Sequence, residues 1–200
     1  MTSGPIGILV LAAGGSSRMG RPKQLLQFNG TTLVRRAAEA ALSVGRLVVV
    51  VTGASADEVA TELRELPVTI VLNPNWARGM GSSIRIGVQG LIDLEPNLDA
   101  LVITLCDQPG VSARILGALI DSHRVAGKLL CAASFGDAVG PPALLGREFF
   151  SELLSLPDAH GAKQILMKHP ESLSRLHCPE AARDIDTPVD YESLGLPDDR

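Results

Sequence analysis

The stretch "LVLAAGGSSRMGRPKQLLQFNG", Leu9 to Gly30, decides the fold of this chain. Its first residues belong to the apolar run Ile6–Ala13, which has the length of a strand and no alternation of polar residues. The run stops at two glycines, and the cations Arg18 and Lys23 follow. An unbroken aliphatic run of this kind is typical of a parallel strand covered on both faces. The stretch therefore predicts a buried strand that leads into a flexible, cationic loop.

Apolar runs alternate with segments of helical periodicity along the rest of the chain. Strands are expected at Ile6–Ala13, Leu47–Thr52, Val68–Leu72, Ala100–Leu105 and Leu129–Ala133, with a short edge strand at Leu173–His177. Helices are expected at Thr31–Val44, Ser55 to about Leu66, about Ser82 to Pro96, Ser112–Ala126, Arg147–Leu156 and Gly161–His169. The segment 134–146, "SFGDAVGPPALLG", is expected to be irregular. This order predicts an α/β fold, a three-layer α/β/α sandwich around a mostly parallel, Rossmann-like sheet.

Composition limits the class of protein. The 200 residues suit one domain, residues 1–200, with residues 192–200 as a solvated tail. The net charge of −4 argues against nucleic acid as the main ligand, because binding to a phosphate backbone requires a basic field. Three widely spaced cysteines predict a reducing, cytoplasmic location. The run Ile6–Ala13 is too short to span a membrane, so no membrane partner is expected.

The loop after the first strand has the residues of a phosphate site. Gly14 and Gly15 allow the backbone to approach an anion closely, and successive N–H groups can form an anion-binding nest. Arg18 and Lys23 add cations that suit phosphate oxygens. The loop is neither a GxxxxGK[ST] loop nor a GxGxxG fingerprint. The second strand ends in Thr52-Gly53 without an acidic residue, which argues against an NAD site.

Carboxylates and serines follow other predicted elements. Asp107 comes directly after a strand, where it can start a turn or hold Mg²⁺ against phosphates. Asp184 and Asp186 lie near the end of the chain, and either can cap a helix or bind the metal. In "GMGSS", Ser82 and Ser83 would begin a helix, where N–H groups and hydroxyls favour an anion or a base edge.

No pattern of nucleophilic or metal-binding catalysis stands out among the remaining residues. Cys106 is interpreted as strand packing rather than as a nucleophile. The histidines lack the mutual spacing of metal ligands and are interpreted as surface or helix-end residues; they are His123, His160, His169 and His177.

A longer pattern identifies a family resemblance. Residues 11–26 closely resemble the signature of nucleotidyltransferases with a glycosyltransferase-A-type fold. The matching string is Leu11-Ala12-Ala13-Gly14-x-Ser16-x-Arg18-Met19-Gly20-x-Pro22-Lys23-x-Leu25-Leu26. Four later strings are similar to the molybdenum cofactor cytidylyltransferase branch of the MobA-like NTP transferases: "GMGSSIRIG" (79–87), "CDQPGV" (106–111), "GPPALL" (140–145) and "DIDTPVDY" (184–191). The likeness extends from Ile8 to Tyr191.

This resemblance implies transfer of CMP from CTP to the phosphate of molybdopterin, which releases pyrophosphate. Transfer between two phosphates needs charge neutralisation rather than a strong base. By matched positions, Arg18, Lys23 and Asp107 are catalytic, and Asp107 and Asp186 bind Mg²⁺. The residues implied in nucleotide binding are Leu11, Ala12, Ala13, Gly14, Gly15, Lys23, Gly79, Ser82 and Ser83.

The choice of base rests on one side chain. Related guanylyltransferases typically have "LAGG" in the first loop, whereas this chain has "LAAG", and the methyl of Ala13 leaves less room for a purine. A guanylyltransferase, or a nucleotidyltransferase for another phosphorylated acceptor such as a sugar phosphate, is the nearest alternative. An alternative from another class is a non-catalytic carrier that delivers molybdenum cofactor to a molybdenum hydroxylase client.

Overall fold

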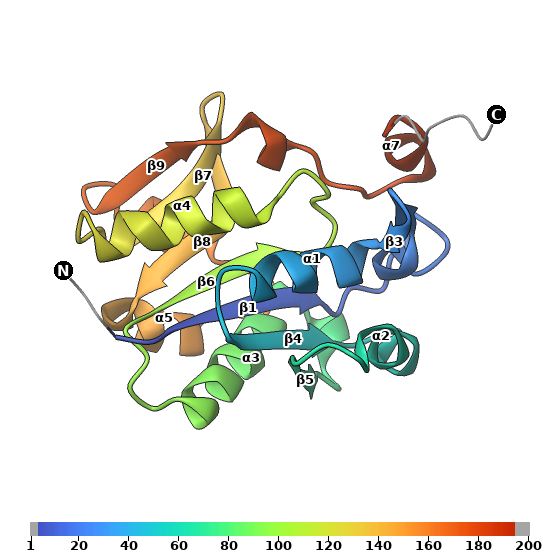
Figure 1. The fold of residues 1–200 in the computed structure, drawn as a ribbon, viewed down its shortest axis with the longest axis horizontal. Coiled ribbons are helices and arrows are strands. Elements are labelled where there is room, and N and C mark those ends of the chain that lie inside the picture. The colour runs from blue at the N-terminus through green and yellow to red at the C-terminus, as the bar shows by residue number, and fades with distance from the viewer. Residues whose placement is uncertain (1–3, 195–200) are drawn as a thin grey trace.

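A seven-stranded sheet forms the centre of the computed structural model, which describes residues 4–194 (Figure 1). Its strand order is β5-β4-β1-β6-β8-β7-β9, and only β8 runs against the others. The strands are β1 (Ile6–Ala12), β4 (Leu47–Thr52), β5 (Thr69–Leu72), β6 (Ala100–Leu105), β7 (Leu130–Phe135), β8 (Ala138–Gly146) and β9 (Leu173–His177). The predicted mostly parallel sheet is confirmed.

Helices cover both faces of this sheet. The helices are α1 (Leu33–Leu42), α2 (Ala56–Leu63), α3 (Met80–Leu94), α4 (Ala113–Arg124), α5 (Phe150–Leu154), α6 (Lys163–Lys168) and α7 (Pro188–Glu192). Short 3₁₀ turns are η1 (Lys23–Leu25), η2 (Trp76–Arg78), η3 (Arg147–Phe149) and η4 (Pro179–Ala182). The three-layer sandwich is therefore confirmed.

Strand β1 shows why the apolar run has no alternation. Successive side chains of a strand point to opposite faces. Ile8 and Val10 pack in a cluster with α1, α2 and α4, whereas Leu9 and Leu11 pack in a second cluster with α3, α5 and α6. All seven residues of β1 are buried, so both faces require apolar side chains.

The expectation that 134–146 is irregular is wrong. Gly136-Asp137 form a two-residue turn, and β8 then returns as an interior strand between β6 and β7. Two consecutive prolines argued against such a strand, because proline cannot donate to the ladder. The structure accommodates them at a bulge: the β7 partners jump from Ala143 to Gly140, and β6 pairs only with residues from Ala143 onward.

A small hairpin precedes α1. Strands β2 (Gln27–Phe28) and β3 (Thr31–Thr32) pair across Asn29-Gly30, and both turn residues have positive φ. Asn-Gly is a common two-residue hairpin turn, so the sequence itself carries the signal for this hairpin. Consequently α1 begins at Leu33 rather than at Thr31, and the Thr32 side chain caps it by accepting a hydrogen bond from the N–H of Arg35.

The end of the described chain departs from the predicted tail. Glu192 still belongs to α7, and Leu194 packs beside a buried cluster, so residues 192–194 are part of the fold. Residues 195–200 of the predicted tail lie outside the described residues.

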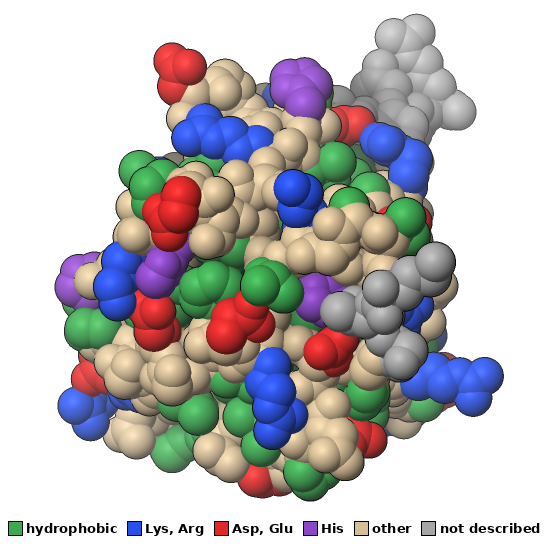
Figure 2. Space-filling view, turned by 90° about the vertical axis from the view of Figure 1, so that its left-hand side faces the viewer, with side chains coloured by type: hydrophobic (Ala, Val, Ile, Leu, Met, Phe, Trp, Pro, Cys, Tyr) green, Lys and Arg blue, Asp and Glu red, His purple; other side chains and the backbone are tan. Residues whose placement is uncertain are grey.

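Two surface properties bear on partners. Within residues 4–194, no helix combines the length and the apolar character that a bilayer crossing requires. On the face at the left of Figure 1, acidic and basic side chains of the described residues are interspersed, and no single sign dominates (Figure 2).

Candidate functional site

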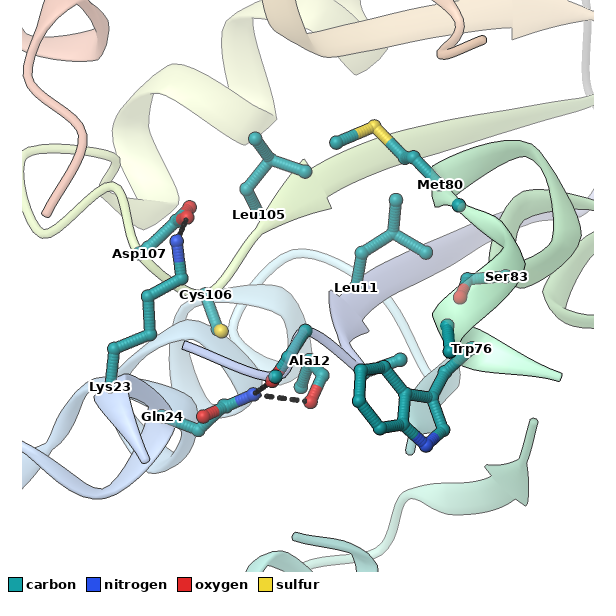
Figure 3. Close-up of a pocket in the computed structure, with 15 residues that line it drawn as sticks. Leu11, Ala12, Lys23, Gln24, Trp76, Met80, Ser83, Leu105, Cys106 and Asp107 are labelled. Atoms are coloured by element: carbon teal, nitrogen blue, oxygen red, sulfur yellow. Dashed lines mark hydrogen bonds and ion pairs between the residues drawn. The ribbon is translucent and has the colours of Figure 1, made fainter. Parts of the chain in front are cut away.

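A cleft of about 310 Å³ opens where β1 and β6 end. From β1 the chain adds β4 and β5 on one side of the sheet and then β6 on the other side. Ligands of open α/β sheets bind at such a switch point, beyond the carboxyl ends of the strands. Most of the predicted nucleotide-binding residues line the cleft: Leu11, Ala12, Ala13, Gly14, Gly15, Lys23, Gly79 and Ser83. Asp107 also lines it, with Leu105 and Cys106 (Figure 3).

The loop after β1 is held in shape by Gln24, a residue that the sequence analysis did not single out. Its side chain is buried, and its amide nitrogen donates to the carbonyl oxygens of Ala12 at 3.0 Å and Gly14 at 2.6 Å (Figure 3). On the other side of the loop, the Lys23 N–H donates to the hydroxyl of Ser16 at 2.9 Å. The signal available in the sequence was its position directly after Lys23.

Four charged residues meet at the mouth of the cleft. The Lys23 ammonium lies 2.5 Å from the Asp107 carboxylate and 2.8 Å from that of Asp186, and Arg18 contacts Asp186 at 2.8 Å. Burial alone would lower the pKa of Lys23, but the two carboxylates outweigh it and raise the pKa. The hydrogen bond from Lys23 likewise lowers the pKa of Asp186. The structure therefore brings together all four predicted charged residues, which are distant in sequence.

Ile185 explains how Asp186 reaches this place. Its side chain is fully buried with Met19, Leu26 and Leu33, which come from the loop after β1 and from α1. Its backbone N–H also donates to the carbonyl oxygen of Asp107 at 2.9 Å. The last described segment is thus fixed to the end of β6 and to the cationic loop together.

The two neighbours of Ile185 have different partners. Asp186 contacts Lys23 and Arg18, whereas Asp184 accepts a hydrogen bond from the Gln108 amide at 2.9 Å. Burial raises the pKa of Asp184, and repulsion from Asp107 and Asp186 adds to it despite the bond from Gln108. Neither aspartate caps α7, because Thr187 and Asp190 form a capping box there.

Asp107 and Asp186 are the residues that could hold a metal ion. The Oδ1 atom of Asp107 is buried and has no hydrogen-bond partner among the described residues, so it is free to accept a cation or a water molecule. Within the described part of the chain, no group of three or more His, Cys, Asp or Glu residues is arranged as a metal site. A donor set of two carboxylates suits Mg²⁺, which usually takes one or two carboxylates with phosphate oxygens and water.

The two predicted serines at the start of α3 have different surroundings. Ser83 lines the cleft and accepts a hydrogen bond from the Asn73 amide at 2.9 Å. Ser82 does not line it, since its hydroxyl donates to the carbonyl oxygen of Gly79 at 2.8 Å and accepts from Asn73. Nucleotide binding by Ser82 stays a prediction, and in this structure its hydroxyl closes the first turn of the helix.

Trp76 is a further cleft residue that sequence reasoning missed. It begins η2, is half-buried, and lines the cleft beside Ser83 (Figure 3). A Cβ atom added at Gly15 would lie 2.7 Å from the indole ring, so the ring rests directly on the loop backbone.

The buried thiols agree with the interpretation of Cys106 as packing. All three cysteines are buried and free, and burial raises the pKa of Cys106, Cys131 and Cys178. A thiol whose pKa is raised is a poor nucleophile at neutral pH.

Known structures share both the fold and the length of this chain. A nucleotidyl transferase from Methanothermobacter thermautotroptrophicus superposes with a TM-score of 0.79 at 26% identity, over 95% of each chain. Rv0371c from Mycobacterium tuberculosis H37Rv gives 0.78 at 27% identity, over 95% of this chain and 97% of that one. A manganese complex of Rv0371C gives 0.78 at 26% identity. With the glycine-rich loop and the charged cluster, these matches define the class of protein as a nucleotidyltransferase.

The family follows from the sequence match. Residues 8–173 match the model of the MobA-like NTP transferase domain, and the chain belongs to this family. The Escherichia coli K12 molybdenum cofactor cytidylyltransferase is 26% identical over 187 residues, 93% of each chain. The nicotine blue oxidoreductase of Paenarthrobacter nicotinovorans is 42% identical over 118 residues, which span 58% of this chain and 56% of that protein. The predicted family resemblance is confirmed.

Proposed function

We propose that this protein transfers CMP from CTP to the terminal phosphate of molybdopterin, the organic part of molybdenum cofactor. The observation that carries the proposal is the meeting of Arg18, Lys23, Asp107 and Asp186 at the mouth of a cleft lined by the glycine-rich loop. The similarity to the E. coli cytidylyltransferase along 93% of both chains supports the choice of reaction.

The reaction fits a site without a strong base. An anionic phosphate oxygen of the acceptor attacks the α-phosphorus of CTP, a new P–O bond forms, and pyrophosphate leaves with the electrons of the broken P–O bond. Negative charge accumulates on the phosphorus oxygens and on the leaving group, so fixed cations stabilise the transition state. Lys23 and Arg18 supply these cations and exchange their carboxylate partners for phosphate oxygens.

Asp107 and Asp186 would hold Mg²⁺, which supplies further neutralisation of phosphate charge when bound. The unpartnered Asp107 Oδ1 supports this assignment, as does the manganese complex of the M. tuberculosis relative. The side chains of Asp107 and Lys23 are only 14% and 15% exposed, so their charges act with little screening by solvent.

Ala13 supports CTP over GTP. Its side chain is buried where the loop borders the cleft, so the methyl occupies space that a glycine would leave for a larger base. The alternative within the class is GTP, since a probable molybdenum cofactor guanylyltransferase from Bacillus cytotoxicus is 33% identical over 106 residues. We also propose a reducing cellular location for the protein, on the ground of its free thiols. The proposal further includes delivery to a molybdenum hydroxylase client.

The test is pyrophosphate release from purified protein with Mg²⁺ and molybdenum cofactor, comparing CTP, GTP, ATP and UTP. We expect release with CTP, and its loss by a factor of about 10³ or more in Asp107→Asn, whose fold should persist. Asp121→Asn, an exposed aspartate in the last turn of α4, is the matched control and should be fully active. Binding of cofactor without release from any nucleotide would instead support the carrier.

The relative named nicotine blue oxidoreductase supports a second candidate, an oxidoreductase, for which NADH and NADPH are the hydride donors to test. The two proteins align over 58% of this chain, and 42% of the aligned residues are identical. Against it, β4 ends in Thr52-Gly53 and offers no carboxylate to a ribose. Oxidation of NADH or NADPH by an added quinoid dye, without pyrophosphate release from CTP, would favour this candidate.

A further inference from the structure

Trp76 is the sole tryptophan of the chain and the only aromatic ring among the described residues that line the cleft. In a protein with 3% aromatic residues, such a side chain at a ligand cleft requires an explanation. Trp76 packs partly against the core cluster of α3 and is otherwise open to the cleft.

Two glycines fix the position of the indole. A Cβ at Gly15 would lie 2.7 Å from the ring atom Cζ3, and one at Gly53 would lie 2.7 Å from the Trp76 Cβ. Real atoms do not approach so closely, so the ring lies against the backbone at the ends of β1 and β4 only because both residues lack side chains. The indole therefore packs closely on the backbone beside the cleft.

The cleft has two chemically different ends. Lys23 and Asp107 lie at one end, whereas Trp76 and Ser83 lie at the other (Figure 3). Leu11, Leu105 and Met80 line the space between them (Figure 3). A nucleoside triphosphate whose phosphates contact the charged end extends its base toward the indole.

Ser83 adds a polar group beside the ring. Its oxygen accepts from Asn73, and no acceptor for its own proton lies among the residues that the structure describes. The hydroxyl can therefore donate to a ring nitrogen or a carbonyl of a base, next to a flat surface suited to stacking.

We propose that Trp76 is a substrate-contacting residue on which the base of the nucleoside triphosphate stacks, with the Ser83 hydroxyl donating to the base edge. The proposal rests on the proposed function only for the choice of CTP. Stacking on an aromatic side chain accepts every base, so Trp76 contributes affinity whereas Ala13 and Ser83 contribute selection.

The test compares one ligand that has a base with one that lacks it. Affinities of CTP and of inorganic tripolyphosphate, each with Mg²⁺, are measured by calorimetry for the wild type, Trp76→Ala and Trp76→Phe. We expect CTP binding to weaken about 10- to 100-fold in Trp76→Ala and less in Trp76→Phe, while tripolyphosphate binding is unchanged. A collapsed loop would weaken both ligands equally, and that result would overturn the proposal.

Intrinsic fluorescence gives an independent readout, because the wild type has a single tryptophan. CTP should change its emission more than tripolyphosphate does at equal saturation. Equal CTP affinity in the wild type and Trp76→Ala would refute stacking and leave the proposed function intact. If GTP or ATP binds in place of CTP, the proposed function fails and the same comparison with that nucleotide decides on Trp76. A folded wild type that binds no nucleoside triphosphate would overturn both.

Discussion

Ile185 connects the stability of the protein to the geometry of its site, and shortening this side chain to alanine should separate the two. The change Ile185→Ala removes three carbon atoms from a fully buried position. At about 0.8 kcal/mol for each buried carbon, the lost transfer free energy is about 2.4 kcal/mol, and the cavity that remains brings the usual cost to about 2–5 kcal/mol.

This cost should fall mainly on the docking of the last segment. The cluster of Ile185 with Met19, Leu26 and Leu33 is separate from the two clusters that cover the sheet. A docking penalty of about 2–3 kcal/mol reduces the ratio of docked to undocked segment roughly 30- to 150-fold. Since Asp186 is carried by this segment, pyrophosphate release should fall much more than the stability of the sheet.

Hydrogen exchange resolved along the chain measures this effect, together with thermal unfolding and pyrophosphate release. We expect faster exchange confined to residues 184–194 and a loss of turnover similar to that of Asp186→Asn. Val189→Ala is the matched control, because Val189 lies in the same segment and is 71% exposed. Unchanged exchange of 184–194 in Ile185→Ala, or an equal loss of protection in the strands, would refute the reasoning.

Three further substitutions test other parts of the structure. Gln24→Leu removes the hydrogen-bond donor of two backbone carbonyls, so the free energy of unfolding should fall by about 1–3 kcal/mol, and tripolyphosphate affinity should fall as well. Chemical denaturation measures the first effect and calorimetry the second. Gly79 has φ 129°, and a carbonyl oxygen lies where the Cβ of an alanine would be, so Gly79→Ala should destabilise the fold by more than the roughly 1–3 kcal/mol of backbone strain alone. Gly127→Ala is its control, because Gly127 has φ 63° and open space around it. Equal melting temperatures of the two variants would contradict the clash. The raised pKa of Asp184 means that its ionised form disfavours folding above that pKa, and stability rises as the pH falls through it. Asp184→Asn, which can still accept from Gln108, should therefore melt higher than the wild type at neutral pH and equally at strongly acidic pH; a lower melting temperature at neutral pH would contradict this sign.

Much of the fold follows from local patterns. Strand β1 and strand β6 are buried on both faces, so apolar residues dominate both, with Thr104 as the polar exception in β6, and such runs are visible in a sequence. The same patterns did not find β8, because Pro141-Pro142 is a local signal against a strand. Its place between β6 and β7 depends on long-range pairing that tolerates a bulge, and no local signal reports such pairing.

The site divides in the same way. The sequence by itself placed the glycine-rich loop with Arg18 and Lys23 after the first strand, and the carboxylate of Asp107 at a strand end, since the glycines and this carboxylate follow apolar runs closely. Only the tertiary structure decided that Asp186, rather than Asp184, meets Lys23, and that Ser83, rather than Ser82, borders the cleft. Residues of one type that lie one or two positions apart look alike in a sequence. They differ here through what packs beside them: Ile185 in its buried cluster, and the Gly79 carbonyl at the N-cap of α3.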